Sequence, residues 1–228
     1  MTTRRVNLNT ESVDNYLKAI YSLGGTNEER VTSSALSDRL GVAPASITNM
    51  LQKLAGSQPP LVEYESRCGV RLSADGRRRA LEILRHHRLL ESFLYEVLDY
   101  PIEEVHDEAE RLEHFISERL EERIDAKLGR PKLDPHGHRI PARDGKISKR
   151  ASKSLAEIEK EGKFVVDSVS DRDAALLKRL KAHGITPGVR LHVTRSNHDE
   201  LVLRTSGSSK PLHLYRSVAG AVRVRSAK

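Results

Sequence analysis

The sequence predicts a mainly helical chain with a small amount of β structure, divided into three folded parts. Three observations support this prediction: two short helices joined by a glycine turn near the N terminus, a central run of amphipathic helices, and a C-terminal segment that alternates short β-like runs with one helix. A length of 228 residues is enough for two or three small domains, each with its own core. We therefore expect domains at residues 1–74, 75–130 and 151–228, with a linker at 131–150.

The N-terminal part has the pattern of a winged helix-turn-helix. Apolar residues recur at helical spacing within 11–23 and 32–54, and Gly41 interrupts the second of these stretches. Two short helices around such a turn are typical of helix-turn-helix units. Two β-like runs, 61–65 and 69–72, follow and predict the hairpin of the wing.

The second helix of this pair presents small and amide side chains on its outward face. Such side chains can enter the major groove of DNA and contact base edges. Lys53 in the helix and Arg67 in the wing suit phosphate contacts. The expected DNA-binding residues are Ala43, Pro44, Ser46, Thr48, Asn49, Gln52, Lys53 and Arg67. The formal charge of +7 favours a polyanionic partner, although helix-turn-helix units also serve as protein-binding modules.

The central part concentrates imidazole and carboxylate side chains at helical spacing. Four of them stand at i, i+4, i+7 and i+8 along a helix predicted over 105–114, and so share one stripe of it: His106, Glu110, Glu113 and His114. His87 and Glu91 repeat the i, i+4 spacing on a long helix predicted over 77–98. Nitrogen and carboxylate donors without a thiolate suit a divalent first-row metal ion. The competing interpretation is a solvated, ion-paired helix face.

The remaining segments complete the predicted architecture. An apolar stripe over 116–128 predicts another helix, and because the helices are too few to enclose a core alone, we expect a homodimer. Proline and glycine punctuate 131–150, so its His136 and His138 are not assigned to the metal site. The tail is predicted to be a small β-barrel, with β-like runs at 164–169, 189–194, 201–204 and 221–224 and a helix near 174–182.

Several classes of protein are disfavoured by what the sequence lacks. The single cysteine, Cys68, excludes an internal disulfide and fits a reducing cytoplasm. There is no apolar run of 18 residues and no signal-peptide pattern, so we expect a cytoplasmic protein that does not enter a membrane. We find no glycine-rich phosphate loop and no nucleophile arrangement of recognisable spacing, and we expect no organic cofactor.

Several of these stretches resemble the metal-dependent repressors typified by the diphtheria toxin repressor. The matching stretches are 14–21, 69–72, 85–91, 105–114 and 134–141, together with 170–173 and 184–188 of the tail. The tail is similar to the SH3-like (FeoA-type) domain of that family. The resemblance covers nearly the whole chain. It implies a homodimer that binds double-stranded operator DNA when metal is bound and represses metal-uptake genes.

The resemblance also implies two metal ions per subunit. One cluster takes its donors from the predicted 105–114 helix and from the first helix: Glu110, Glu113, His114, and Asp14 or Asn15. A second cluster combines the two central helices with one side chain of the tail: His87, Glu91, His106, and Asp171 or Asp173.

The identity of the metal follows from departures from the family pattern. Iron-responsive members carry Cys where this chain has Glu110, and Met where it has Asn15. The loss of both sulfur donors favours Mn²⁺, with Fe²⁺ as the alternative. Manganese-responsive members carry acids where Asn15 and Lys18 stand, so the paired-ion geometry of that branch is not implied unchanged.

Two other classes of function remain open at this point. A di-metal enzyme could use the same His and Glu stripe, and its turnover would survive changes to Asn49 and Lys53. A DNA-binding module that senses an organic effector would leave the stripe solvated. Its DNA affinity would not respond to a metal titration.

Overall fold

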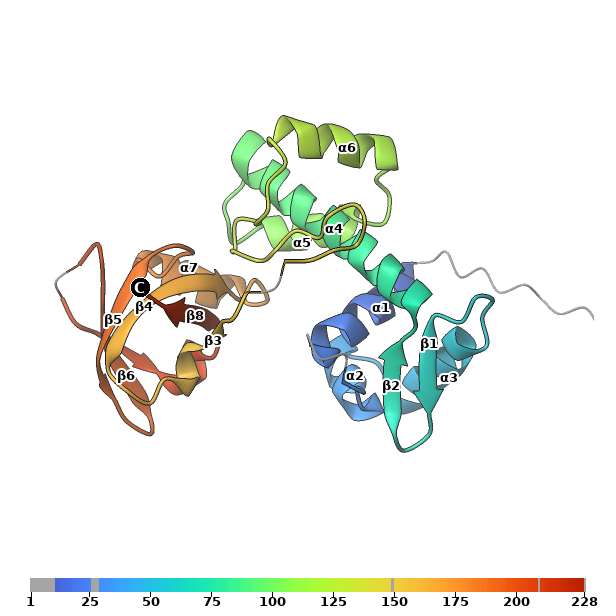
Figure 1. The fold of residues 1–228 in the computed structure, drawn as a ribbon, viewed down its shortest axis with the longest axis horizontal. Coiled ribbons are helices and arrows are strands. Elements are labelled where there is room, and N and C mark those ends of the chain that lie inside the picture. Colours follow the sequence, from blue (N-terminus) through green and yellow to red (C-terminus); the bar gives the residue numbers. More distant parts are fainter. Residues whose placement is uncertain (1–10, 26–28, 149, 209, 228) are drawn as a thin grey trace, which may run out of the picture. The chain divides into compact units, whose positions relative to one another are not determined.

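The computed structural model describes residues 11–25, 29–148, 150–208 and 210–227 (Figure 1). The chain divides into two compact units. The first unit consists of the chain up to His86 together with Pro141–Gly145. The second consists of His87–Ile140 and the chain from Lys146 onward. The long helix α4 (Ala74–Val97) contributes to both units.

The first unit is a winged helix-turn-helix. Its elements before α4 are α1 (Glu11–Gly24), α2 (Ser33–Leu40), α3 (Pro44–Ala55), β1 (Val62–Glu65) and β2 (Gly69–Leu72). The Thr32 side chain caps α2 by accepting a hydrogen bond from the Ala35 N–H, and Gly41 ends that helix in the left-handed conformation. Pro44 then starts α3. These local signals produce the tight turn that the sequence predicts.

A close backbone approach joins the wing to α4. The Ser73 N–H donates to the Leu61 carbonyl at 3.1 Å. A Cβ atom at Gly76 would lie only 1.9 Å from the same carbonyl oxygen, so glycine is required there. β1 and β2 pair antiparallel, with Val62 opposite Leu72.

The helical part of the second unit packs α5 (Val105–Leu112) and α6 (Glu118–Lys127) against the C-terminal half of α4. Its core consists of Leu89, Leu90, Leu94, Val105, Ala109, Ile124 and Ile140. The helix predicted over 105–114 ends at Leu112. Glu113 caps it, and because its N–H still donates to the Ala109 carbonyl at 2.9 Å, its side chain keeps the helical direction.

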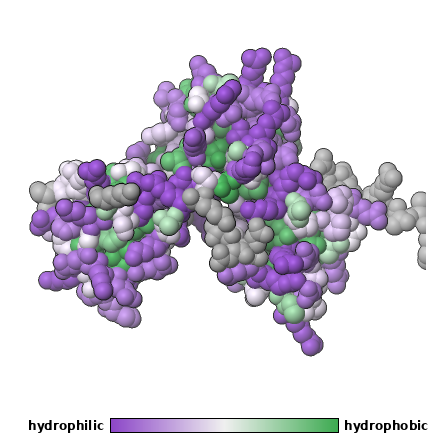
Figure 2. Space-filling view, in the orientation of Figure 1, coloured by the Kyte–Doolittle hydropathy of each residue, from purple (hydrophilic) through white to green (hydrophobic). Residues whose placement is uncertain are grey.

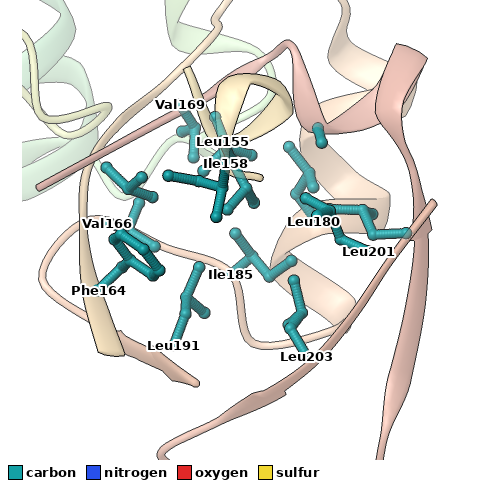
Figure 3. Packing of buried hydrophobic residues seen from close by; sticks show 14 of the residues in the cluster. Leu155, Ile158, Phe164, Val166, Val169, Leu180, Ile185, Leu191, Leu201 and Leu203 are labelled. Atoms are coloured by element: carbon teal, nitrogen blue, oxygen red, sulfur yellow. The ribbon is translucent and has the colours of Figure 1, made fainter. Parts of the chain in front are cut away.

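The C-terminal part of the second unit is an antiparallel six-stranded sheet in the order β3-β8-β4-β5-β6-β7. The strands are β3 (Lys153–Ser154), β4 (Gly162–Val169), β5 (Arg190–Ser196), β6 (Glu200–Thr205), β7 (Leu212–Tyr215) and β8 (Val222–Ser226). The helices are the 3₁₀ turn η1 (Leu155–Glu157), α7 (Ala174–Ala182) and α8 (Arg216–Ala219). Leu180 of α7 points into the core beside Leu201 and Leu203 of the sheet (Figure 3).

The predicted tail elements correspond to β4, β5, β6, β8 and α7. The sequence did not predict β3, β7 or α8, which are short. Register shifts in β4 at Val166/Ser168 and in β5 at Val193/Arg195 mark β-bulges, which bend strands and help a small sheet to wrap around its core.

The segment 131–150 differs from the expected linker, because part of it packs onto the sheet. His136 is fully buried, and its carbonyl accepts a hydrogen bond from the Val169 N–H at 3.0 Å. Gly137 has φ +86, and a Cβ atom there would lie 2.3 Å from the Asp167 carbonyl oxygen. Glycine is therefore needed both for the turn and for the close approach.

Hydrophilic side chains cover most of the surface seen in Figure 2, and apolar ones appear as small separate groups. Within the described ranges, no helix has the length and apolar character that a membrane crossing requires.

Candidate metal centre and nucleic-acid interface

Helix α3 separates a buried face from an exposed one. Ile47, Leu51 and Leu54 are fully buried in the core of the first unit. The predicted DNA-binding residues lie at the start of α3, on its outward face and in the wing, and all are exposed except Thr48, which is partly buried. The Thr48 hydroxyl donates to the Pro44 carbonyl at 3.2 Å. The helix therefore presents amide, hydroxyl and basic groups on one accessible face, as contact with base edges and phosphates requires.

The wing is braced by ion pairs around its hairpin. Arg71 contacts Glu63 across the two strands at 2.6 Å, and Arg30 contacts Glu65 at 2.5 Å. Arg67 is exposed in the turn between the strands and has φ 69. This position suits a contact with a DNA phosphate.

In the second unit, the His87 ring lies between two groups of candidate ligands. Its Nδ1 is 2.6 Å from Glu113 Oε2 and 3.5 Å from Glu110 Oε2. Its Nε2 is 3.0 Å from Glu91 Oε1 and 3.1 Å from His106 Nδ1. Helical spacing produces this arrangement: α4 supplies His87 and Glu91, and α5 and its C-cap supply the others.

The group on the Nδ1 side is partly open to solvent. His87, Glu110 and Glu113 offer ligand atoms that all lie within 4.8 Å of one another. The Glu110 side chain is 42% exposed, whereas that of Glu113 is fully buried. His114 Nε2 lies 3.3 Å from Glu113 Oε1, so the predicted His114 adjoins this group.

The group on the Nε2 side is completed from the C-terminal domain. His87, Glu91, His106 and Asp171 form a set with ligand atoms within 4.8 Å of one another. Asp171 Oδ2 lies 3.8 Å from His106 Nδ1. Asp173, the other expected candidate, is exposed and caps α7 by accepting a hydrogen bond from the Leu176 N–H at 2.9 Å. The structure therefore brings Asp171 to the group and leaves Asp173 outside it.

Sequence reasoning missed two histidines that join this second group. Asp134 Oδ1 accepts the backbone N–H groups of His136 and His138, both at 2.9 Å, which fixes the turn. His136 Nδ1 then lies 3.5 Å from Glu91 Oε1, and His138 Nδ1 lies 3.4 Å from Asp171 Oδ2. The available signal was the alternate spacing of Asp134, His136 and His138, which themselves form a third group of possible ligands.

A divalent cation fits these residues. Glu91 is fully buried, and its Oε2 has no hydrogen-bond partner among the described residues. His136 donates from Nε2 to the Ile102 carbonyl at 3.1 Å, while its Nδ1 also lacks a hydrogen-bond partner within the described ranges. Buried polar atoms without partners are costly, and coordination to a cation would satisfy both. An imidazole held by a carbonyl at one nitrogen is typical of metal ligands.

The charges of this group are strongly coupled. Burial raises the pKa of the Glu91 carboxyl, but attraction to His87 and the nearby rings of His106 and His136 outweigh it and hold the pKa well below the ordinary value. Burial lowers the pKa of His136, but Glu91 reverses this and raises it to about 9. For Asp171, burial opposes a net lowering of the pKa by the nearby histidines, His138 first. Glu91 and Asp171 therefore favour cations in their surroundings.

The remaining predicted ligands, Asp14 and Asn15, belong to α1 and hence to the first unit. Asp14 Oδ1 forms an ion pair with Arg79 Nε at 2.6 Å. Asn15 Oδ1 is buried and has no hydrogen-bond partner among the residues that the structure describes. The groups around His87 belong to the second unit.

Comparison with known proteins accounts for the exposed face of α3 and for the groups of candidate metal ligands. Three family models match in succession: "Iron dependent repressor, N-terminal DNA binding domain" over residues 9–70, "Iron dependent repressor, metal binding and dimerisation domain" over 73–142, and "FeoA domain" over 153–226. The HTH-type transcriptional regulator MntR of Oceanobacillus iheyensis is 35% identical over 109 residues, which are 47% of this chain and 71% of that protein. The chain belongs to the diphtheria toxin repressor family.

Other members of the diphtheria toxin repressor family match over nearly the whole chain. The iron-dependent repressor IdeR of Mycobacterium leprae is 28% identical over 229 residues, which cover 94% of this chain and 96% of that protein. A solved structure of a manganese-dependent transcriptional repressor in complex with manganese is 35% identical, with a TM-score of 0.85 and coverage of 94% of this chain and 99% of the other. The family consists of metal-dependent transcriptional repressors. This chain is therefore a DNA-binding regulator of that kind and not a di-metal enzyme.

Proposed function

We propose that this protein is a Mn²⁺-responsive repressor that acts in the cytoplasm as a metal-loaded homodimer, binds palindromic operator DNA and represses metal-uptake genes. The observation that carries the proposal is the buried His87 ring between two groups of nitrogen and oxygen donors, with no sulfur atom in either group. Such donor sets suit Mn²⁺, and Fe²⁺ is the nearest alternative. The likeness to a manganese-dependent repressor supports the choice of Mn²⁺.

The two groups around His87 provide for two ions per subunit. We assign Glu110, Glu113 and His114 to the open group on the Nδ1 side. We assign His87, Glu91, His106 and Asp171 to the closed group on the Nε2 side, with His136 as an additional ligand that the buried Nδ1 atom supports. Asp14 or Asn15 of α1 remains a proposed contributor to the first group. Asp173 has a capping role and is left out of the assignment.

The chain's own residues explain how metal would alter its conformation. The closed group draws on α4, α5, the Asp134 turn and the segment before α7, four segments distant in the sequence. A bound cation supplies attraction to all these donors at once and so favours the conformation that brings them together. Shifting a two-state equilibrium from about 1:99 to 99:1 requires a roughly 10⁴-fold preference for one state. Several ligands per ion, drawn from these segments, supply that preference.

DNA contact is assigned to the outward face of α3 and to the wing, with Asn49 and Gln52 facing bases and Lys53 and Arg67 facing phosphates. Exposed apolar side chains of the helical part, Leu98, Phe115 and Leu120, offer a surface to a second copy of the chain. A twofold dimer would match the two halves of a palindromic site.

The test is binding of the full-length protein to a palindromic promoter fragment without metal and with Mn²⁺, Fe²⁺, Zn²⁺ or Ca²⁺. We expect tight binding with Mn²⁺ and a loss of the metal response in Glu110→Ala. Asp107→Asn is the matched control, because Asp107 is an exposed acid of the same helix outside the three ligand groups. Asn49→Ala should weaken DNA binding without changing the uptake of Mn²⁺.

Equal DNA affinity with and without metal would contradict the proposed metal response. A response to Fe²⁺ under anaerobic conditions, with none to Mn²⁺, would assign the protein to iron instead. A metal response that Asp107→Asn abolishes as fully as Glu110→Ala would remove the support for the assigned ligands.

A further inference from the structure

The positive charge of the chain is concentrated in its C-terminal part. Residues 151–228 contain 15 Lys and Arg against 8 Asp and Glu, a surplus of 7, which equals the formal charge of +7 for the entire chain. Residues 1–150, which include the winged helix, are therefore balanced in charge. The surplus positive charge that attracts polyanions at long range therefore lies in the domain that carries the sheet.

Within that domain, basic side chains gather on the outer face of the sheet. Along β5 and β6, the inward residues form part of the core seen in Figure 3 and alternate with outward residues, and Lys163 of β4 is the exposed neighbour of the core residue Phe164. The outward, exposed basic positions are Lys163, Arg190, His192, Arg195 and Arg204, which we call the basic face. Helix α7 packs on the core side through Leu177 and Leu180, so it does not cover this face.

The strand register places these basic residues near one another. His192 of β5 stands directly opposite Lys163 of β4 and Arg204 of β6. Among the described residues, no carboxylate lies within ion-pair distance of Lys163, Arg190 or Arg204. Within the described residues, carboxylates therefore do not neutralise the positive charges of Lys163, Arg190 and Arg204.

The spacing of the basic face fits an extended anion better than a small one. Neighbouring strands are about 4.8 Å apart, so Lys163 and Arg204 stand roughly 10 Å apart, and Arg190 is offset by about 7 Å along its strand. The cations thus spread over an open surface instead of converging on one point. Double-stranded DNA carries about one negative charge per 1.7 Å of axis and presents matching rows of phosphates.

We propose that the basic face binds the phosphate backbone of DNA, so that the C-terminal domain adds sequence-independent affinity to the base contacts of the winged helix. The inference rests on the proposed function, because it takes DNA as the polyanion that this repressor meets. It assigns to the sheet domain a role separate from the donation of Asp171 to the metal centre. Such contacts release counterions and steepen the dependence of DNA affinity on salt.

The test compares two triple variants of the full-length, Mn²⁺-loaded protein that each lose three positive charges. Lys163→Gln/Arg190→Gln/Arg204→Gln alters the basic face, and Lys178→Gln/Arg179→Gln/Lys181→Gln alters exposed positions of α7 on the other side of the core. DNA affinity is measured by fluorescence anisotropy between about 50 and 300 mM salt, on an operator duplex and an unrelated duplex. Thermal midpoint and Mn²⁺ stoichiometry verify that both variants are folded.

We expect the basic-face variant to bind both duplexes at least about 10-fold more weakly at 100 mM salt, with a slope of log K against log salt shallower by about 0.9 per lost phosphate contact. The α7 variant should keep nearly the wild-type slope. Equal losses in the two variants would reduce the effect to net charge and overturn the proposal. So would loss of binding to phosphatidylserine-rich vesicles with unchanged DNA affinity, which would assign the face to a membrane.

The two proposals can fail separately. Suppose that wild-type protein binds the operator only with metal and that the basic-face variant has the same salt slope as wild type. The proposed role of the basic face is then wrong, and the proposed repressor function stands. Suppose instead that the basic-face variant loses affinity for both duplexes but DNA binding by wild-type protein does not respond to metal. The proposed repressor function is then wrong, and the proposed role of the basic face stands. If wild-type protein binds neither duplex at low salt, both are wrong.

Discussion

The two sides of the His87 ring offer the same kinds of donor in different surroundings. On the Nε2 side, Glu91 is fully buried and is met by His106 and His136. On the Nδ1 side, Glu113 is equally buried and faces His87 and His114, but Glu110 leaves 42% of its side chain exposed. A buried carboxylate that already faces imidazoles is pre-organised and poorly hydrated, whereas an exposed one must give up water and side-chain freedom to bind an ion. We infer that the closed side determines affinity and the open side determines access.

Replacing Glu91 should have the largest effect, because its carboxylate contacts three imidazoles of the closed side. We expect Glu91→Gln to remove one of the two proposed ions per subunit, with an affinity loss above the roughly 10- to 100-fold typical of residues that only support ligands. Isothermal titration calorimetry and native mass spectrometry would measure this. Glu96→Gln, an exposed position of the same helix, is the control. Retention of two tightly bound ions would reverse the ranking of the two sides.

Glu110→Gln should have a smaller effect on affinity than Glu91→Gln and should leave the ion of the closed side in place. The reason is that Glu110 is already partly hydrated. Stopped-flow chelation should show faster release of one ion only. A loss of both ions would show that the open side supports the closed one.

Replacing the two histidines of the Asp134 turn one at a time tests whether burial or mere proximity to the ligand group determines their contribution to Mn²⁺ binding. His136 is fully buried and lies beside Glu91, whereas the His138 side chain is 23% exposed. We expect His136→Gln to weaken Mn²⁺ binding about 10-fold or more and His138→Gln to weaken it several-fold less. Titrations of the two variants under one set of conditions give the comparison. Equal effects would mean that the two histidines support the site equally.

The closed side should also make Mn²⁺ binding depend on pH. Burial lowers the pKa of His136, but Glu91 raises it to about 9, so this ring carries a proton at neutral pH that a bound ion must displace. Mn²⁺ affinity should therefore rise with pH toward about 9, by at most about tenfold per pH unit from this group. Calorimetry in buffers of different ionisation enthalpy would detect the released proton. A pH-independent affinity would contradict the assignment.

The same group has the opposite effect on the metal-free fold. Because the pKa of His136 in the folded state exceeds its ordinary value of 6.5, the stabilisation is complete below about pH 6.5 and is lost as pH rises to about 9. Thermal midpoints of metal-free protein across this range should fall with pH. His136→Gln should flatten that part of the profile.

The smallest effect is expected for Asp173. Asp173→Ala removes the N-cap of α7 and should cost about 1 kcal/mol of stability, with unchanged Mn²⁺ binding. Asp171→Asn, two residues away, should weaken Mn²⁺ binding with little change in stability. Urea denaturation and metal titration of the pair would show whether the two roles are separate.

The sequence predicted those features that a regular period determines. Helical spacing aligned His106, Glu110 and Glu113 on one stripe, and the turn at Gly41 located the helix-turn-helix. Both wing strands and four of the six tail strands were also found, whereas two-residue β3 and four-residue β7 were not.

Features that depend on irregular segments could not be predicted from the sequence. The turn of Asp134 has no period, so nothing in its composition showed that it folds onto β4 and buries His136. The choice between Asp171 and Asp173 depends on where α7 begins, and a shift of two residues exchanges a capping role for a ligand role. The position of His87 between two groups required the packing of α4 against α5.

His87 has a further consequence for how such a sensor responds. A neutral imidazole has one lone pair and one N–H, so the ring can coordinate on only one side while it donates to a carboxylate on the other. Whichever group is filled first therefore selects the tautomer that the other group meets. The two metal positions then do not bind ions independently. Because they share the His87 ring, the steepness of the metal response depends on both positions together.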